Sequence, residues 1–122
     1  MLATNDTLRT LHLASNRIGT PGAVALADGL KTNSTLSTLF LGDNSIGPEG
    51  GTALGSMLIA NTGLTEVSLW RNTLDVGGGR AVAEALVSPA CRLRKLNVGE
   101  NNLGMQGGAA VLSALETNKG TR

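Results

Sequence analysis

Hydrophobic residues recur with two different periodicities, which alternate along the chain. In short segments such as Leu11-His12-Leu13, apolar and polar residues alternate, which is typical of a β-strand. Downstream, Ala23, Leu26 and Leu30 are spaced by three and four residues, which is typical of a helix with one buried face. The pattern therefore predicts short strands that alternate with helices of about three turns each.

The same strand pattern, Leu-x-x-Leu-x-Leu-x-x-Asn, occurs four times, with Val in place of one Leu in the third and fourth copies. The copies begin at Leu8, Leu36, Leu64 and Leu93, which are 28, 28 and 29 residues apart. Self-similarity at such a period is the signature of a repeat architecture. We predict one repeat domain over residues 1–122, with repeats at about 8–35, 36–63, 64–92 and 93–120, and with 1–7 as the tail of a preceding repeat.

Particular residues mark the turns of each repeat. The Asn that ends the strand pattern is predicted to be buried and to tie neighbouring turns into a ladder, because its amide both donates and accepts hydrogen bonds. Helices are predicted to begin near Pro21 and Pro48, with Thr20 as a helix N-cap, and the glycines that follow are predicted to let each helix approach its strand. An Asn after the helix is predicted in the left-handed conformation, at Asn33, Asn61 and Asn118.

Consecutive strands joined by a helical crossover are parallel, and the crossover is right-handed in nearly all proteins. Four stacked units would place a parallel sheet on one side and a row of helices on the other. Because helices are wider than strands, the stack is predicted to curve with the sheet on its concave side. The predicted fold is therefore an α/β solenoid of right-handed β-α repeats.

These repeats resemble the leucine-rich repeats of the ribonuclease-inhibitor type. The likeness is strongest over Leu8 to Thr35 and extends over nearly the whole chain. It implies a leucine-rich-repeat solenoid that recognises proteins along its concave surface. The single cysteine departs from the cysteine-rich ribonuclease inhibitors, and the third repeat has Pro89 in place of the helix-end Asn and one extra residue between Val87 and Arg92.

The concave face can be read directly from the repeat, since alternate strand residues point away from the core. Position three gives Thr10, Thr38, Glu66 and Lys95; position five gives His12, Phe40, Ser68 and Asn97; position seven gives Ala14, Gly42, Trp70 and Gly99; position eight gives Ser15, Asp43, Arg71 and Glu100. The only Phe and the only Trp of the chain both fall on this surface.

Phe40, Trp70 and Arg71 are predicted to anchor a partner protein, because aromatic and arginine side chains dominate interface hot spots. Small neighbours at position seven favour a Trp70 that stands out from the face; the alternative is a ring that lies against the sheet. The rest of the predicted binding set is His12, Asp43, Glu66, Ser68, Lys95, Asn97 and Glu100. The charged row Asp43, Arg71 and Glu100 is expected to be a solvated surface ladder.

Composition narrows the choice of partner. The net charge of +1 gives no electrostatic reason to expect nucleic acid or an anionic membrane, and the basic residues Arg92, Arg94 and Lys95 are interpreted as a solvated patch. One cysteine and the lack of an apolar leader at the N-terminus favour a cytoplasmic location. The predicted partner is a protein, with no nucleic acid and no membrane.

No catalytic or metal-binding set emerges from the sequence. His12 is the only histidine, Cys91 lies beside Arg92 in the irregular third repeat, and the glycine run 77–79 lacks the Gly-Lys-Ser/Thr ending of a phosphate loop. The chain is therefore predicted not to be an enzyme and to need no cofactor or metal.

Two other functions remain open at this stage. The first is regulation of a small GTPase, by analogy with the Ran GTPase-activating proteins among leucine-rich repeat proteins. The second is a structural spacer, a fragment of a longer array. Neither end carries a polar capping unit, so self-association through uncapped ends is also expected.

Overall fold

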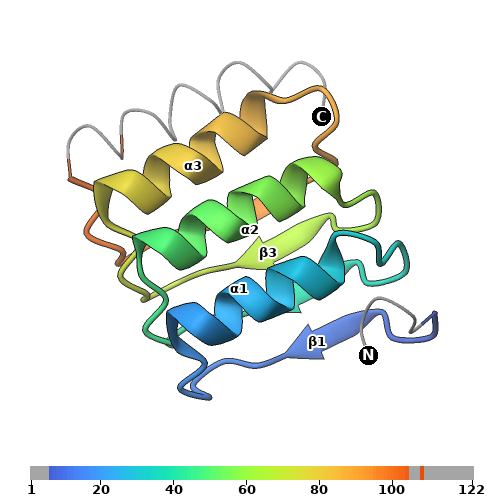
Figure 1. Ribbon diagram of the computed structural model, residues 1–122, viewed down its shortest axis with the longest axis horizontal. Helices are drawn as coiled ribbons and strands as arrows, with labels where there is room; N and C mark the ends of the chain where they lie inside the picture. The colour runs from blue at the N-terminus through green and yellow to red at the C-terminus, as the bar shows by residue number, and fades with distance from the viewer. Residues whose placement is uncertain (1–5, 105–107, 109–122) are drawn as a thin grey trace.

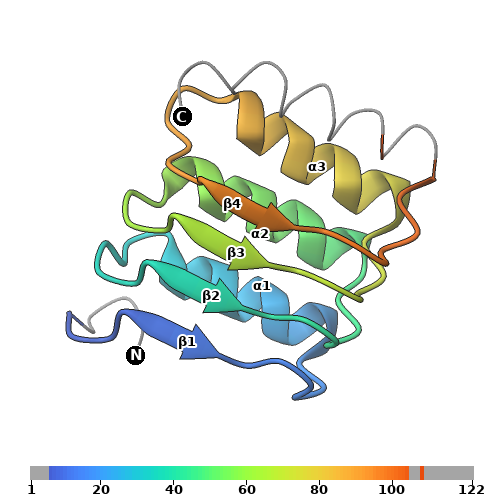
Figure 2. The same ribbon diagram turned by 180° about the vertical axis from the view of Figure 1, so that it is seen from behind.

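The computed structural model describes residues 6–104 and Gly108. Strands and helices alternate along it, and Figures 1 and 2 show the strands on one side of the molecule and the helices on the other. The strands are β1 (Thr10–His12), β2 (Thr38–Phe40), β3 (Glu66–Ser68) and β4 (Lys95–Asn97), and the helices are α1 (Gly19–Leu30), α2 (Pro48–Ala60) and α3 (Asp75–Val87). The predicted order of strand and helix is confirmed.

The four strands form one parallel sheet in the order β1-β2-β3-β4. Thr10 pairs with Thr38, Thr38 with Glu66 and Glu66 with Lys95, so each residue lies beside its equivalent in the next repeat. Pairing continues past the short strands: the amide of Asp43 donates to the carbonyl oxygen of Trp70 at 2.8 Å. The solenoid of β-α repeats is confirmed, and its sheet face away from the helices is called the open face below.

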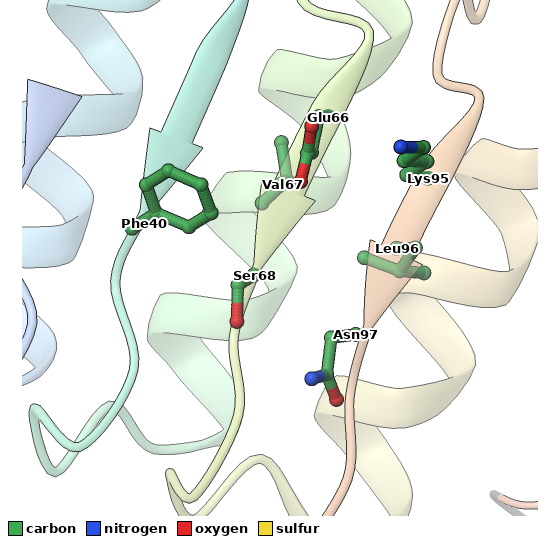
Figure 3. Close-up of a pocket in the computed structure, with 7 residues that line it drawn as sticks. All are labelled: Phe40, Glu66, Val67, Ser68, Lys95, Leu96 and Asn97. Atoms are coloured by element: carbon green, nitrogen blue, oxygen red, sulfur yellow. The ribbon is translucent and has the colours of Figure 1, made fainter. Parts of the chain in front are cut away.

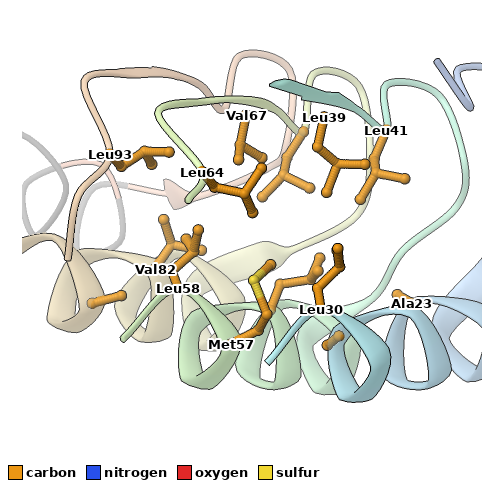
Figure 4. Packing of buried hydrophobic residues seen from close by; sticks show 14 of the residues in the cluster. Ala23, Leu30, Leu39, Leu41, Met57, Leu58, Leu64, Val67, Val82 and Leu93 are labelled. Carbon is orange, nitrogen blue, oxygen red and sulfur yellow. The ribbon is translucent and has the colours of Figure 1, made fainter. Parts of the chain in front are cut away.

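The core lies between the sheet and the helices, where Figure 4 shows the repeated aliphatic side chains packed together. Leu39 and Leu41 from β2 and its continuation are fully buried, and so are Leu30 of α1 and Met57 of α2. Because each repeat supplies the same leucines at the same register, the core is one continuous layer rather than four separate clusters.

The predicted ladder of strand-end asparagines is present. The Asn72 Oδ1 accepts hydrogen bonds from the amides of Asn44 at 2.9 Å and Ile46 at 3.1 Å in the preceding repeat. Asn44 does the same for the amides of Asn16 and Ile18, at 2.8 and 3.2 Å. Asn44, Asn72 and Asn101 are buried, but Asn16 is exposed, which differs from the prediction of four buried residues.

The helix-end asparagines act differently from the prediction. Asn61 has φ −73° and ψ 136°, and Asn33 is not among the residues with positive φ, so neither adopts the left-handed conformation. Both are buried, and the Asn61 side-chain amide donates to the carbonyl oxygens of Leu30 at 2.7 Å and Asn33 at 2.8 Å. A second ladder therefore joins repeats at the other end of the strands. Asn118 lies outside the described residues.

The prediction that Thr20 caps the first helix was wrong. Helix α1 begins at Gly19, its N-cap is Ile18, and no side-chain cap bond is made there. The Thr20 hydroxyl instead accepts a hydrogen bond of 2.9 Å from the amide of Gly47, in the next repeat. Pro48 does stand in the first turn of α2, as predicted. The Thr20 hydroxyl therefore joins the first repeat to the second, whereas an N-cap hydrogen bond would have stayed within helix α1.

The glycines allow close packing mainly between neighbouring helices, not between helix and strand as predicted. A Cβ added to Gly51 would lie 3.0 Å from the Cα of Gly78, and one added to Gly55 would lie 2.8 Å from the carbonyl oxygen of Ala81. Helix α2 therefore rests on α3 almost backbone to backbone. Across the part of the chain that the structure describes, no helix has the length and apolar character needed to cross a membrane.

The third repeat ends irregularly, as its extra residue predicts. Helix α3 ends at Val87, and the Ser88 hydroxyl accepts a hydrogen bond from the amide of Ala90 at 3.2 Å. The amide of Cys91 donates to the carbonyl oxygen of Ser88 at 3.1 Å. Pro89, which takes the place of the helix-end Asn, has no side-chain amide to join the second ladder.

Candidate functional site

The open face is organised by lines of equivalent residues that run across the strands. At position five, His12 pairs in register with Phe40, Phe40 with Ser68 and Ser68 with Asn97. The His12 and Phe40 rings are stacked, with centroids 4.6 Å apart and planes inclined by 21°. From β1 to β4, two aromatic rings are therefore followed by two smaller polar side chains, so the open face is lower beside Phe40 than at the rings.

A hollow of about 300 Å³ opens at that step. It is lined by Phe40, Glu66, Val67, Ser68, Lys95, Leu96 and Asn97. Figure 3 shows the Phe40 ring on one side, Glu66 and Lys95 together at one end, and Ser68 and Asn97 toward the other. Glu66 and Lys95 are register partners on β3 and β4, so one negative and one positive charge border the same end of the hollow.

Trp70 lies beyond the end of β3, between two glycines of neighbouring repeats. A Cβ on Gly42 would lie 3.6 Å from the Trp70 Cε3, and a Cβ on Gly99 would lie 3.2 Å from its Cδ1. The ring therefore rests across both glycines, which is the alternative given above, and the prediction that it stands out from the face was wrong. It still exposes 39% of its surface, which leaves a large apolar area open to solvent or to a partner.

Arg71 and the residues at the same position of the other repeats have an unusual backbone conformation, with positive φ. The position-eight residues Ser15, Asp43, Arg71 and Glu100 all have φ between 52° and 60°, in the left-handed region that side chains rarely adopt. The Arg71 guanidinium lies over the Trp70 ring, 5.7 Å from Cζ to the ring centroid, in a cation–π contact. Asp43 accepts a hydrogen bond of 3.0 Å from the Ser15 hydroxyl.

The structure thus divides the predicted binding residues into two groups on one face. Phe40, Glu66, Ser68, Lys95 and Asn97 border the hollow, and His12 stacks on the Phe40 ring. Trp70, Arg71, Asp43 and Glu100 lie past the carboxyl ends of the strands. Sequence reasoning missed the hollow itself, although the order of side-chain sizes at position five was a readable signal for it.

The residues considered for catalysis lie in separate settings. His12 is exposed on β1, whereas Cys91 is buried and belongs to the hydrophobic core. Glycines 77–79 lie inside α3, so they form no phosphate-binding loop. Among residues 6–104 and Gly108, no three His, Cys, Asp or Glu side chains come together as metal ligands would.

Comparison with known proteins agrees with this architecture. A family model described as Leucine Rich repeat matches residues 4–27 and 32–55, which overlap the first two repeats. No curated protein matches the chain in sequence. Together with the parallel sheet and its helical crossovers, the match gives the chain the fold of a leucine-rich repeat protein.

Two solved structures have the same fold. The tropomodulin C-terminal domain of Caenorhabditis elegans is 14% identical, with a TM-score of 0.79 over 94% of this chain and 71% of that one. Leiomodin-1 Actin-Binding Site 2 is 26% identical, with a TM-score of 0.80 over 98% of this chain and 69% of that one. The first likeness, at 14% identity, bears on the fold alone.

Proposed function

We propose that this chain is a non-catalytic protein-binding module that holds its partner on the open face of the repeat sheet. The observation that carries the proposal is Trp70, which is 39% exposed, supported underneath by two glycines and covered on one side by Arg71. A large ring held in one place loses little conformational freedom on binding, so its burial contributes fully to affinity.

Phe40 provides a second anchor on the same face. Its ring is half-buried, stacked with His12, and forms one wall of the hollow. Two aromatic anchors bordered by polar and charged groups form the arrangement of an interface centre with its rim.

Actin is the first partner to test. Leiomodin-1 Actin-Binding Site 2 has the same fold as nearly all of this chain at 26% identity. The repeat subtype belongs to the same proposal: the 28- and 29-residue spacing and the two asparagine ladders support the ribonuclease-inhibitor type.

We expect a Phe40→Ala, Trp70→Ala double variant to bind its partner about tenfold or more weakly than the native chain, because loss of a hot-spot ring typically costs about 2 kcal/mol or more. Co-sedimentation with filamentous actin and gel filtration with monomeric actin would measure the change. Ile59→Ala is the matched control, since it removes a 41% exposed apolar side chain from helix α2. Circular dichroism would establish that all variants are folded.

The outcomes separate the parts of the proposal. Binding of actin by the native chain and the control, but not by the double variant, supports both the partner and the face. If the native chain leaves actin unbound, actin is excluded, and the same three proteins are then used to capture partners from lysate. Equal capture by the native chain and the double variant would remove the binding site from the open face, and capture of nothing would favour a structural spacer.

A further inference from the structure

The hollow beside Phe40 has polar groups of unequal character. Of the four polar side chains that line it, Lys95 offers donors only and Glu66 offers acceptors only. The Asn97 Oδ1 accepts a hydrogen bond of 3.0 Å from the amide of Gly99, which fixes the side chain and leaves its NH₂ group to donate. Figure 3 shows this nitrogen on the side of Asn97 that faces Ser68.

Ser68 adds to the donor side. Its hydroxyl oxygen lies 3.5 Å from the amide nitrogen of Trp70, which donates to it, so the hydroxyl proton can point elsewhere. Three of the four polar side chains around the hollow, Lys95, Asn97 and Ser68, can therefore donate to an occupant. A group that accepts several hydrogen bonds at once satisfies them best, and a carboxylate has two such oxygens.

The charges near the hollow also favour an anionic occupant. Lys95 is preceded in the chain by Arg92 and Arg94, and all three are exposed. Glu66 is the one acidic side chain that lines the hollow, and its register partner Lys95 offsets it. Of the three basic residues, Lys95 is the one that lines the hollow. An incoming anion is attracted by its charge, whereas an incoming cation would be repelled by it and would leave the donors without acceptors.

We infer that the hollow receives an acidic side chain from an acidic segment of the partner protein. Its carboxylate accepts hydrogen bonds from Asn97 Nδ2 and the Ser68 hydroxyl, and its methylene groups pack against the Phe40 ring. The Lys95 ammonium group supplies the opposite charge from the other end of the hollow. A volume of about 300 Å³ is at the small end of ligand pockets, which suits one side chain better than a whole small molecule. This inference rests on the proposed function and specifies the chemistry that the open face selects.

The test uses a phage-displayed library of random peptides, panned on the native chain, followed by calorimetric titration of the enriched peptides. We expect enriched sequences to carry Asp or Glu at a fixed position. Lys95→Glu should weaken their binding about tenfold or more, since like charges placed together are strongly unfavourable. Glu66→Gln should strengthen it, because a competing carboxylate is removed.

Lys31→Glu is the matched control, since it makes the same change in net charge at an exposed residue that follows helix α1, away from the open face. Equal weakening by Lys95→Glu and Lys31→Glu would overturn the inference, because long-range attraction alone would then explain binding. Basic or neutral consensus sequences, or none, would overturn it as well. Ile59 lies on helix α2 and does not line the hollow, so Ile59→Ala should leave peptide binding unchanged.

Failure of the inference can be told apart from failure of the proposed function. If the partner is lost with the Phe40→Ala, Trp70→Ala variant but the peptides show no acidic preference, the open face binds its partner by other chemistry. If acidic peptides bind at the hollow but the partner is captured equally by that variant, the hollow is a real site and the open face is not the main interface.

Discussion

Replacing Asn72 by Ala is expected to lower the free energy of unfolding by about 3–5 kcal/mol, because several buried backbone groups would lose their partners together. The Asn72 side chain accepts from two amides, those of Asn44 and Ile46. It donates to the carbonyl oxygens of Leu41 at 3.1 Å, Leu69 at 2.9 Å and, more weakly, Trp70 at 3.4 Å. Urea unfolding followed by far-ultraviolet circular dichroism would measure the loss.

The chain supplies its own control for this experiment. Asn16 occupies the same repeat position but is exposed, and its side-chain amide donates locally to the carbonyl oxygen of Ala14 at 3.1 Å. Asn16→Ala is expected to cost less than about 1 kcal/mol, since water can replace that bond. Equal losses for the two variants would mean that the ladder does not stabilise the stack.

The second large effect is expected at the contact between α2 and α3. Gly55→Ala should destabilise the fold by about 1–3 kcal/mol, because the new methyl group would overlap the backbone of the next helix. Its Cβ would lie 2.8 Å from the Ala81 carbonyl oxygen and 3.1 Å from the carbonyl carbon. The same substitution in an unobstructed helix stabilises by up to about 1 kcal/mol, so the sign of the effect is diagnostic.

Gly77→Ala is the control for the sign of the stability change. Gly77 is exposed in α3, and a Cβ there would meet only the Pro48 Cβ, at an ordinary contact distance of 3.6 Å. This variant is expected to gain about 0.5–1 kcal/mol. Thermal unfolding of both proteins would measure the pair, and a gain from Gly55→Ala would show that the helices can separate without cost.

The fold was predictable because the repeat period alone fixes which residues lie side by side. Once Thr38 and Glu66 are known to hold the same repeat position, their pairing in the sheet follows, and the lines across the open face follow with it. The strand-end ladder was predictable for the same reason, since a polar amide at a buried turn must find backbone partners.

What could not be predicted depends on contacts between repeats. Nothing near Thr20 in the sequence shows that its hydroxyl binds the amide of Gly47, 27 residues later. The burial of Asn61 was missed because local propensity favours a turn conformation, while the carbonyl oxygens it binds lie in the preceding repeat. For Trp70, small neighbours favour a ring that stands out from the face, but the missing Cβ atoms of Gly42 and Gly99 allow the ring to lie flat across both glycines.

The second ladder also bears on repeat length. Asn61 joins its own repeat to the one before it, and its Oδ1 accepts from the amides of Gly63 and Leu64, so the distance along the chain from this Asn to the next strand is fixed. Pro89 cannot make these bonds, and its repeat is the one that has 29 residues instead of 28. The side chain of the helix-end Asn therefore fixes the number of residues between the helix and the next strand. A repeat that lacks this Asn can accept an inserted residue at that place.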